Sequence, residues 1–320
     1  MEGKMLYSGK DLRKLIIPLI IEQMLAIAVG MADTIMVSAA GEAAVSGVSL
    51  VDTVNILLIN VFSALATGGA VVSGHFLGKK KREDACKSAW QILLFATLLA
   101  LVISVIFITA HDPLLRLMFG KIEDDVMKAS KTYLIITTYS FVALAIYNSC
   151  AALFRAMNES KVTMWVSLLM NVINVVGNAI CIYGLHMGVA GVAIPTTISR
   201  YVAAVVIFLL MFQTKKEINL CGQITWKFNG SLIKKILYIA IPNGLENSMF
   251  QLGKILVMSA VATMGTSAIA ANAVTGTIAN WNNLPGFAIN LAIVSVVSVC
   301  VGAGRYDQAR YYTRRLCRDA

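Results

Sequence analysis

The sequence predicts an all-α integral membrane protein built from two parallel repeats, each the whole or part of a helical bundle. Fifty-eight per cent of its 320 residues are hydrophobic and only 14% are charged, which is far from the usage of soluble globular proteins. Residues 12–87 recur without a gap 224 positions later, so that Pro18 matches Pro242 and Glu22 matches Glu246. A repeat of this length in an apolar chain is typical of membrane proteins formed by two homologous bundles.

Eight spanning helices are expected. Each needs about 20 consecutive apolar residues to cross a bilayer. Segments of this kind fall at 15–38, 48–77, 90–110, 132–154, 163–185, 188–212, 236–263 and 270–301. The first is not a cleaved signal peptide, because no small-residue cleavage site follows it and another span comes straight after.

The order of the spans predicts the domain organisation. Residues 1–212 form a six-helix bundle, 213–235 form a polar linker, and 236–320 begin a second bundle with two helices and a basic tail. Because six spans separate the two copies, both copies enter the membrane in the same direction. The repeats are therefore parallel and related by an axis along the membrane normal.

The positive charges are distributed unequally between the two sides of the predicted spans. Of the 27 Lys and Arg residues, 21 fall on the side of the termini and the 213–235 linker, and four fall in the 111–131 loop on the other side. Arg200 and Lys254 lie within spans. This asymmetry predicts a cytoplasmic-membrane protein with both termini in the cytoplasm. The net charge of +10 thus reflects topology and does not indicate a nucleic-acid partner.

Four ionisable residues inside the spans indicate function, because charges in lipid are costly: Glu22, Asp33, Glu246 and Lys254. Glu22 and Asp33 are three helical turns apart and share one face. Glu246 and Lys254 are about two turns apart and could project into one cavity. The alternative for the two glutamates is a structural pairing near their helix ends.

The fifth span carries a stripe of amides. Asn171, Asn174 and Asn178 follow helical spacing, so they lie on one face, which must contact protein or water. Asn280 and Asn283 in the eighth span could line the same cavity or anchor an interface. Amide and carboxylate oxygens are ligands for small hard cations, and a carboxylate can also carry a proton. Hydrogen bonding between helices is the alternative role for the stripe.

No enzyme is indicated, since GxSxG, HExxH, GxxxxGK[ST] and a Rossmann glycine motif are all absent. Without a phosphate-binding loop, ATP cannot energise this chain directly. We expect no cofactor, and coupling to an ion gradient through the carboxylates. Pro18 and Pro242 lie at equivalent depths and are predicted hinges, because proline removes a helical hydrogen bond.

Several stretches together resemble the multidrug and toxic compound extrusion (MATE) family, in its bacterial NorM-like branch. They are IIPLIIEQMLAIAVGMADTIMV at 16–37, FRAMNESKVTMWVSLLMNVINVVGNAICIYG at 154–184, GVAGVAIPTTISR at 188–200 and PNGLENSMFQLGKILVMSAVATMGTSAIAANAV at 242–274. The resemblance implies two lobes of six helices each, and export of organic cations in exchange for Na⁺ or H⁺. This chain would hold six helices of the first lobe and two of the second.

The resemblance also implies site residues. Asp33 matches the aspartate of the first-lobe cation site, and Asn174 and Thr196 match its polar partners. Asn178 stands where some members have a second aspartate. A Na⁺ site at these four residues follows as a hypothesis. Glu246 matches the glutamate of the second-lobe site, to which we add Lys254 as a residue for cation or substrate. Pro18 matches the proline at which the first helix is thought to bend.

The leading hypothesis is a secondary active antiporter that exports drugs or organic cations from the cell as a monomer in the lipid bilayer. One alternative is a lipid-intermediate flippase, whose family shares the two-bundle ancestry and would show a more cationic cavity. Another is a non-functional fragment, because the last four helices of the family are absent from the sequence.

Overall fold

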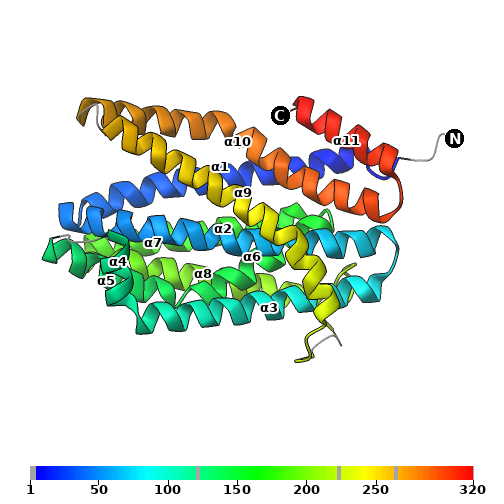
Figure 1. The fold of residues 1–320 in the computed structure, drawn as a ribbon, viewed down its shortest axis with the longest axis horizontal. Helices are drawn as coiled ribbons and strands as arrows, with labels where there is room; N and C mark the ends of the chain where they lie inside the picture. Colours follow the sequence, from blue (N-terminus) through cyan, green and yellow to red (C-terminus); the bar gives the residue numbers. More distant parts are fainter. Residues whose placement is uncertain (1–4, 120–122, 222–224, 263–265, 320) are drawn as a thin grey trace.

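The computed structural model describes residues 5–119, 123–221, 225–262 and 266–319. Lys121 of the predicted 111–131 loop and residues 222–224 of the predicted linker therefore lie outside the described residues. Within these ranges the chain folds into eleven α-helices and one π-helical turn, η1 (Figure 1). The helices are α1 (Gly9–Ser38), α2 (Glu42–Gly78), α3 (Arg82–Thr109), α4 (His111–Phe119), α5 (Asp124–Thr138), α6 (Phe141–Ala156), α7 (Ser160–Ala179, continued by η1, Ile180–Gly184), α8 (Ala190–Leu210), α9 (Gly230–Ala262), α10 (Thr266–Gly302) and α11 (Tyr306–Asp319).

Every predicted span is helical. Among the described residues, six helices are long and apolar enough to cross a membrane, and the bent pair α5–α6 counts as a seventh. The remaining expected span, at 236–263, corresponds to α9, which has 33 residues but does not pass the same test. Polar residues such as Asn243, Glu246 and Gln251 interrupt the apolar sequence in its middle. The chain is thus a multi-pass membrane protein.

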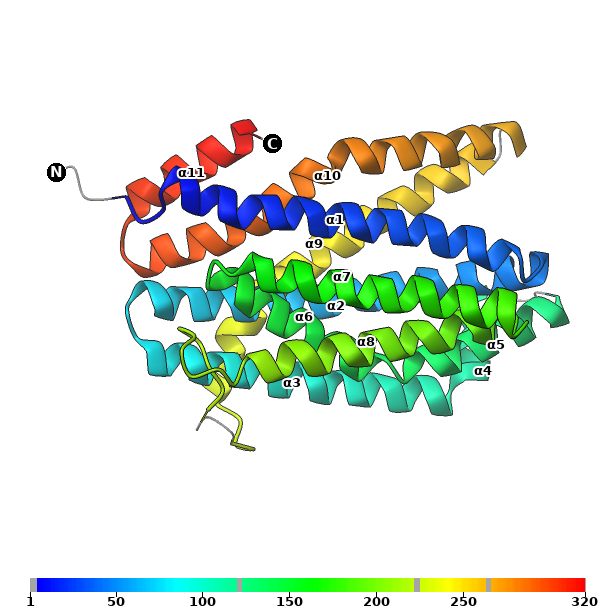
Figure 2. The same ribbon diagram turned by 180° about the vertical axis from the view of Figure 1, so that it is seen from behind.

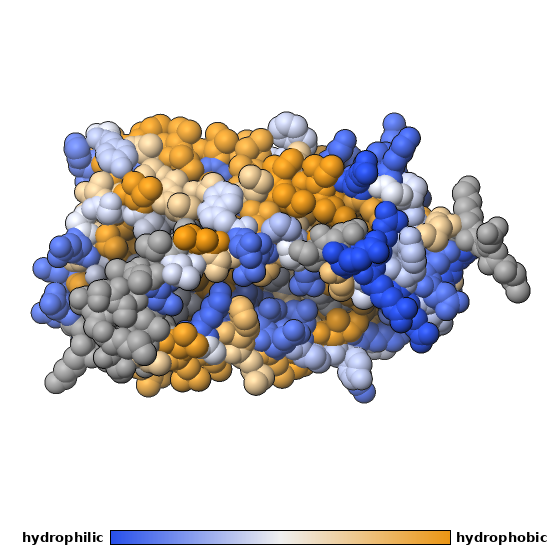
Figure 3. Space-filling model, turned by 90° about the horizontal axis from the view of Figure 1, so that it is seen from above, coloured by the Kyte–Doolittle hydropathy of each residue, from blue (hydrophilic) through white to orange (hydrophobic). Residues whose placement is uncertain are grey.

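The long helices run lengthwise, so the molecule has two ends. We call one the basic end; it holds the connections at 79–81, 157–159 and 303–305 and the described parts of the 211–229 connection, 211–221 and 225–229 (Figures 1 and 2). Helix α1 begins at this end, and α11 begins there and runs back along the molecule. In Figure 3 the darkest hydrophilic colour gathers toward this end, and hydrophobic side chains fill much of the band between the two ends.

The two copies of the repeat fold alike. Helices α2 and α10 begin and end 224 residues apart, as do the starts of α3 and α11 and the ends of α1 and α9. Even the turn after α2 is repeated, because Lys80 (φ 57°) and Gly304 (φ 72°) both adopt the left-handed conformation. The gapless repeat predicted from the sequence is confirmed.

Contacts between the copies are also repeated. Helix α1 packs on α10, where Leu15 and Leu19 lie in one core with Ala292. The equivalent contact joins α9 to α2, where Gly68 leaves room for the backbone of Ile236 and for Ala240. The two copies are therefore related by an approximate two-fold axis that runs along the helices.

Small residues lie on this axis at the basic end. A Cβ atom on Gly78 would collide with the backbone of Val299, Gly302 and Ala303, and one on Gly302 would collide with the backbone of His75. Gly78 and Gly302 occupy equivalent positions, so α2 and α10 meet there backbone to backbone. Toward the other end, α10 separates from α1 in both ribbon views (Figures 1 and 2).

A valine at Gly302 is expected to lower the thermal stability of the purified protein. The new side chain has only backbone in front of it, so α2 and α10 must move apart, at a cost of about 1–3 kcal/mol. The matched control is Gly286→Val on the same helix, where a Cβ meets nothing within 4 Å. Equal melting temperatures for the two variants in detergent would show that the close crossing is not required.

The predicted 132–154 span is not one straight helix. It breaks between α5 and α6 with a bend of 50°. The hydroxyls of Thr137 and Thr138 donate to the carbonyls of Tyr133 and Leu134 one turn earlier, and Ser140 donates to Thr137. Hydroxyls bound to the backbone in this way bend helices, because they compete for the carbonyls of the helix.

The predicted linker is more than a polar tether. Arg82 at the start of α3 donates to the carbonyls of Thr214 (2.9 Å) and Glu217 (3.0 Å). Ile218 and Leu220 are fully buried in the core that also holds Ile236 and Ala240 of α9. The linker is thus packed against the basic end, and α9 begins at Gly230, earlier than predicted.

Candidate functional site

Asp33 lies in the last third of α1 and faces α7. Its Oδ1 accepts a hydrogen bond of 2.8 Å from the side-chain nitrogen of Asn178. Asp33 is partly buried and Asn178 is fully buried. A carboxylate is thus held inside the membrane-spanning part of the protein by an amide of a neighbouring helix.

A chain of hydrogen bonds extends from this pair into α8. The side-chain nitrogen of Asn178 also donates to the side-chain oxygen of Asn174 at 3.4 Å. The side-chain nitrogen of Asn174 in turn donates to the hydroxyl of Thr196 at 2.9 Å. Thr196 donates to the carbonyl of Val192 at 2.8 Å. The four residues predicted for the first-lobe cation site are therefore brought together by three helices.

Close packing of α7 on α8 makes this arrangement possible. A Cβ atom on Gly177 would come within 2.6 Å of the Cβ of Pro195, the residue before Thr196. Only glycine allows the two helices to approach so closely that Asn174 reaches Thr196.

The amide stripe is buried, as its spacing predicts, but two of its atoms lack partners. The side-chain oxygen of Asn178 and the side-chain nitrogen of Asn171 have no hydrogen-bond partner among the described residues. The free oxygen belongs to the amide that already binds Asp33. An oxygen beside a carboxylate suits a small hard cation such as Na⁺, so these residues fit the predicted ion.

A second cluster adjoins Asp33 and was missed from the sequence. Asp52 of α2 accepts hydrogen bonds from the Tyr133 hydroxyl (3.1 Å) and the Asn55 amide (3.3 Å). Asp52 and Arg200 of α8 both lie within electrostatic range of Asp33. Arg200 was recognised as an in-span charge but not placed in the site, and Asp52 was not recognised at all.

The bend between α5 and α6 positions the arginine. Arg200 donates to the Ser140 hydroxyl at 2.8 Å, and Tyr201 donates to the carbonyl of Tyr139 at 2.7 Å. Both acceptors lie where the helix is broken. The TTYS sequence at 137–140 was the signal that could have revealed this contact.

The formal charges of the cluster do not cancel. Asp33 and Asp52 supply two negative charges, and Arg200 supplies one positive charge. One negative charge therefore remains, which is the charge that a single Na⁺ or proton neutralises.

Glu22 and Asp33 share one side of α1, as predicted, and this side faces α7. Glu22 is buried, accepts a hydrogen bond of 2.8 Å from Thr163, and forms an ion pair with Arg155 at 3.4 Å. The pairing considered as the alternative for this glutamate is present, but it lies in the middle of α1 and not near a helix end. Arg155, counted above with the loop charges, lies instead at the end of α6 with a side chain 12% exposed.

The residues predicted for the second lobe are not brought to Asp33. Glu246, Lys254, Asn280 and Asn283 are all exposed on α9 and α10. The Lys254 ammonium lies 4.9 Å from the centre of the Phe250 ring, and no ion pair with Glu246 forms among the described residues. A shared cavity for Glu246 and Lys254 is not seen.

Pro18 and Pro242 both lie inside continuous helices, α1 and α9. Their equivalent positions are thus confirmed by the fold. Their role as hinges stays a prediction.

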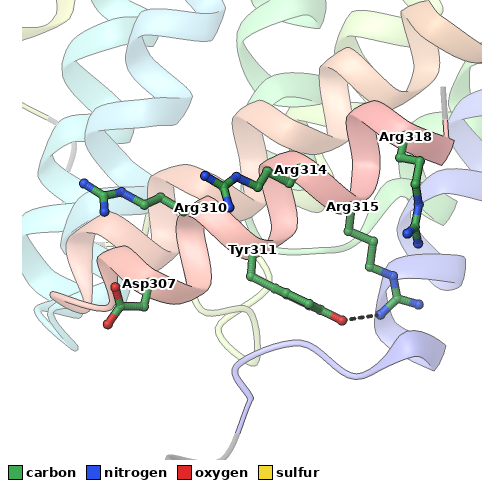
Figure 4. Close-up of a pocket in the computed structure, with 6 residues that line it drawn as sticks. All are labelled: Asp307, Arg310, Tyr311, Arg314, Arg315 and Arg318. Carbon is green, nitrogen blue, oxygen red and sulfur yellow. Dashed lines mark hydrogen bonds between the residues drawn. The ribbon is translucent and has the colours of Figure 1, made fainter.

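A cavity of about 860 Å³ lies away from these residues along α11 at the basic end. Figure 4 shows its four arginines, Arg310, Arg314, Arg315 and Arg318, along one helix, with Arg315 bonded to the Tyr311 hydroxyl. All of its lining residues come from α11. It is therefore a surface hollow and not part of the Asp33 site.

Spanning helices in two parallel repeats, with a buried polar cluster between helices of the first, define the class of multi-pass membrane transporters. A family model described as MatE matches residues 18–180 and 242–317, and the chain belongs to this family. The resemblance to the NorM-like MATE branch is confirmed.

Two relatives illustrate the similarity. "Uncharacterized transporter YisQ" of Bacillus subtilis is 28% identical over 91% of this chain and 64% of its own length. "Probable multidrug resistance protein NorM" of Thermotoga maritima is 25% identical over 93% of this chain and 64% of its own. This chain thus spans less than two thirds of the length of these relatives.

Solved structures confirm the fold. One described as "Outward-facing conformation of a multidrug resistance MATE family transporter of the MOP superfamily" has a TM-score of 0.89. It is 22% identical, and the match covers 97% of this chain and 69% of the other. A MOP superfamily transporter from Pyrococcus furiosus matches with the same score, identity and coverage.

Proposed function

We propose that this chain is the first bundle and part of the second of an antiporter that exports organic cations in exchange for Na⁺ or H⁺. The observation that carries the proposal is the Asp33 carboxylate, which is held inside the first bundle by Asn178 in a hydrogen-bonded chain that joins α1, α7 and α8. The family membership and the names of the relatives, which include multidrug resistance proteins, support the substrate class.

Competition for one charge is the proposed coupling. A negative charge inside the membrane is costly unless a cation or a proton accompanies it. The coupling ion and a cationic drug would therefore alternate at Asp33, and each would displace the other. Asn178, Asn174 and Thr196 would hold the carboxylate in place and complete the ion's ligands with oxygen atoms.

Movement of the two bundles would expose the site to each side in turn. The backbone contact of α2 with α10 closes the basic end, and the helices separate toward the other end. With the basic end in the cytoplasm, as the charge asymmetry predicts, this arrangement would be open to the outside.

Transport into everted membrane vesicles tests the proposal. Vesicles are prepared from cells that express the complete gene. A Na⁺ gradient is imposed on one sample and a pH gradient on another, and the uptake of the fluorescent cation ethidium is followed in each. We expect uptake that needs one of the two gradients and persists without ATP. Uptake that requires ATP, or that equals the uptake of vesicles without the protein, would contradict it.

A further inference from the structure

A second groove lies at the basic end, between α2 and α9, well away from Asp33. Its volume is about 540 Å³. Three ammonium groups and an imidazole surround it, from His75 on α2, from Lys79 directly after α2, and from Lys234 and Lys235 on α9. Its floor is apolar and includes Phe76.

The equivalent place on the other side of the two-fold axis is less basic. There the repeat places Val299 for His75, Ala303 for Lys79 and Asp11 for Lys235, although Lys10 matches Lys234 and Lys14 matches Tyr238. The cavity of about 310 Å³ on that side is lined by Asp11, Val299 and Glu217 and by no lysine. The gathering of three lysines and a histidine around one cavity is therefore not repeated by the fold.

These lysines form no ion pair within the described part of the protein. Lys79, Lys234 and Lys235 have no carboxylate within 4 Å there, and all three side chains are exposed. Like charges gathered in one groove repel each other, so an anion bound among them would be favoured.

We propose that this groove binds one anionic phospholipid, with its phosphate among the lysines and an acyl chain along the apolar floor. The apolar floor continues along the two helices through Val72 of α2, which is a membrane-spanning helix, and Ile239 of α9. An acyl chain would pack against this floor, whereas a soluble anion would not contact it. Tyr238 is 82% exposed beside the lysines, at the level where aromatic side chains meet lipid headgroups.

The site would join the two bundles. Lys79 belongs to the connection that follows α2, whereas Lys234 and Lys235 belong to the first turns of α9. A phosphate that contacts both sides links helices of different repeats close to the Gly78–Gly302 crossing. The lipid would therefore favour the arrangement that is closed at the basic end.

Lipid retention by the purified full chain tests this inference. The protein in neutral detergent is titrated with phosphatidylglycerol or phosphatidylcholine, and bound lipid is counted by native mass spectrometry. We expect one phosphatidylglycerol to bind in preference to phosphatidylcholine. The triple variant Lys79→Gln, Lys234→Gln, Lys235→Gln is expected to lose about a hundredfold in affinity at low salt, since each lysine near a lipid surface contributes roughly fivefold.

The matched control removes three exposed lysines of the same end from outside the groove, as Lys81→Gln, Lys161→Gln and Lys215→Gln. It is expected to bind phosphatidylglycerol as the wild type does. Tyr238→Ser should weaken lipid binding without removing a charge. Equal losses in the two triple variants, equal binding of the two lipids, or displacement of the lipid by millimolar inorganic phosphate would each overturn the proposal.

Discussion

Replacing Asp33 by asparagine is expected to abolish gradient-driven export, with a loss of about a hundredfold or more in the complete protein, equivalent to about 2.7 kcal/mol. The substitution keeps an oxygen that can accept the hydrogen bond from Asn178, so the helices α1 and α7 stay joined. It removes the charge for which ion and drug compete. Asp52 remains, but Arg200 then balances it, and the cluster becomes neutral.

Vesicle uptake of ethidium measures the effect, with the amount of folded protein checked by size-exclusion chromatography. Asp112→Asn is the matched control, because it makes the same chemical change at an exposed carboxylate that is paired with Lys131. Full uptake by the Asp33→Asn protein would refute the role assigned to this carboxylate.

Breaking the Glu22–Arg155 pair is expected to destabilise the protein by about 3 kcal/mol or more. Both side chains are nearly enclosed, at 10% and 12% exposure, so removing one partner leaves the other charge buried without compensation. Arg155→Met should therefore lower the melting temperature strongly. Glu22→Gln should be milder, because an amide can still accept the hydrogen bond from Thr163.

A double-mutant cycle separates this effect from packing. The double variant Glu22→Gln, Arg155→Met contains no buried charge and is expected to recover most of the loss of Arg155→Met. The exposed pair Glu83–Lys87, one turn apart on α3, provides a control whose removal should leave the melting temperature unchanged. A double variant as unstable as the sum of the single ones would show that the two residues act independently.

The parts of the fold predicted from the sequence are those set by local pattern. Apolar length located the spans, and the constant offset of the repeat located equivalent helix ends in α2 and α10. The spacing of Asn171, Asn174 and Asn178 identified one helix face correctly because helical periodicity is a property of the backbone alone.

The parts that were missed depend on contacts between distant residues. Asp52 stands close to the start of its predicted span and resembles an interfacial charge. Only the tertiary fold brings Tyr133, 81 residues away, to its carboxylate. In the same way, nothing in the local sequence around Glu22 reveals that Arg155 and Thr163 will enclose it, although a buried pairing was considered.

The cavity wall suggested by the polar run of Asn280 and Asn283 stays a prediction. Both residues are exposed on α10 in this structure. A polar run in a span predicts a contact with something other than lipid, but it does not identify that contact. A structure of the complete protein would show what faces these residues there.

The meeting of α2 and α10 at the two-fold axis bears on how such a chain could have arisen. In a symmetric dimer of a single repeat, a residue on the axis contacts the same residue of the partner. Any side chain introduced there is therefore present in both copies and must fit against itself. Glycine at position 78 and its equivalent 302 satisfies that condition. One turn earlier, Gly74 lies against the hydroxyl of Ser298, its own equivalent. Two different residues can occupy equivalent positions on the axis only after the repeat has been duplicated and fused. One of the two positions can then change while the other remains glycine.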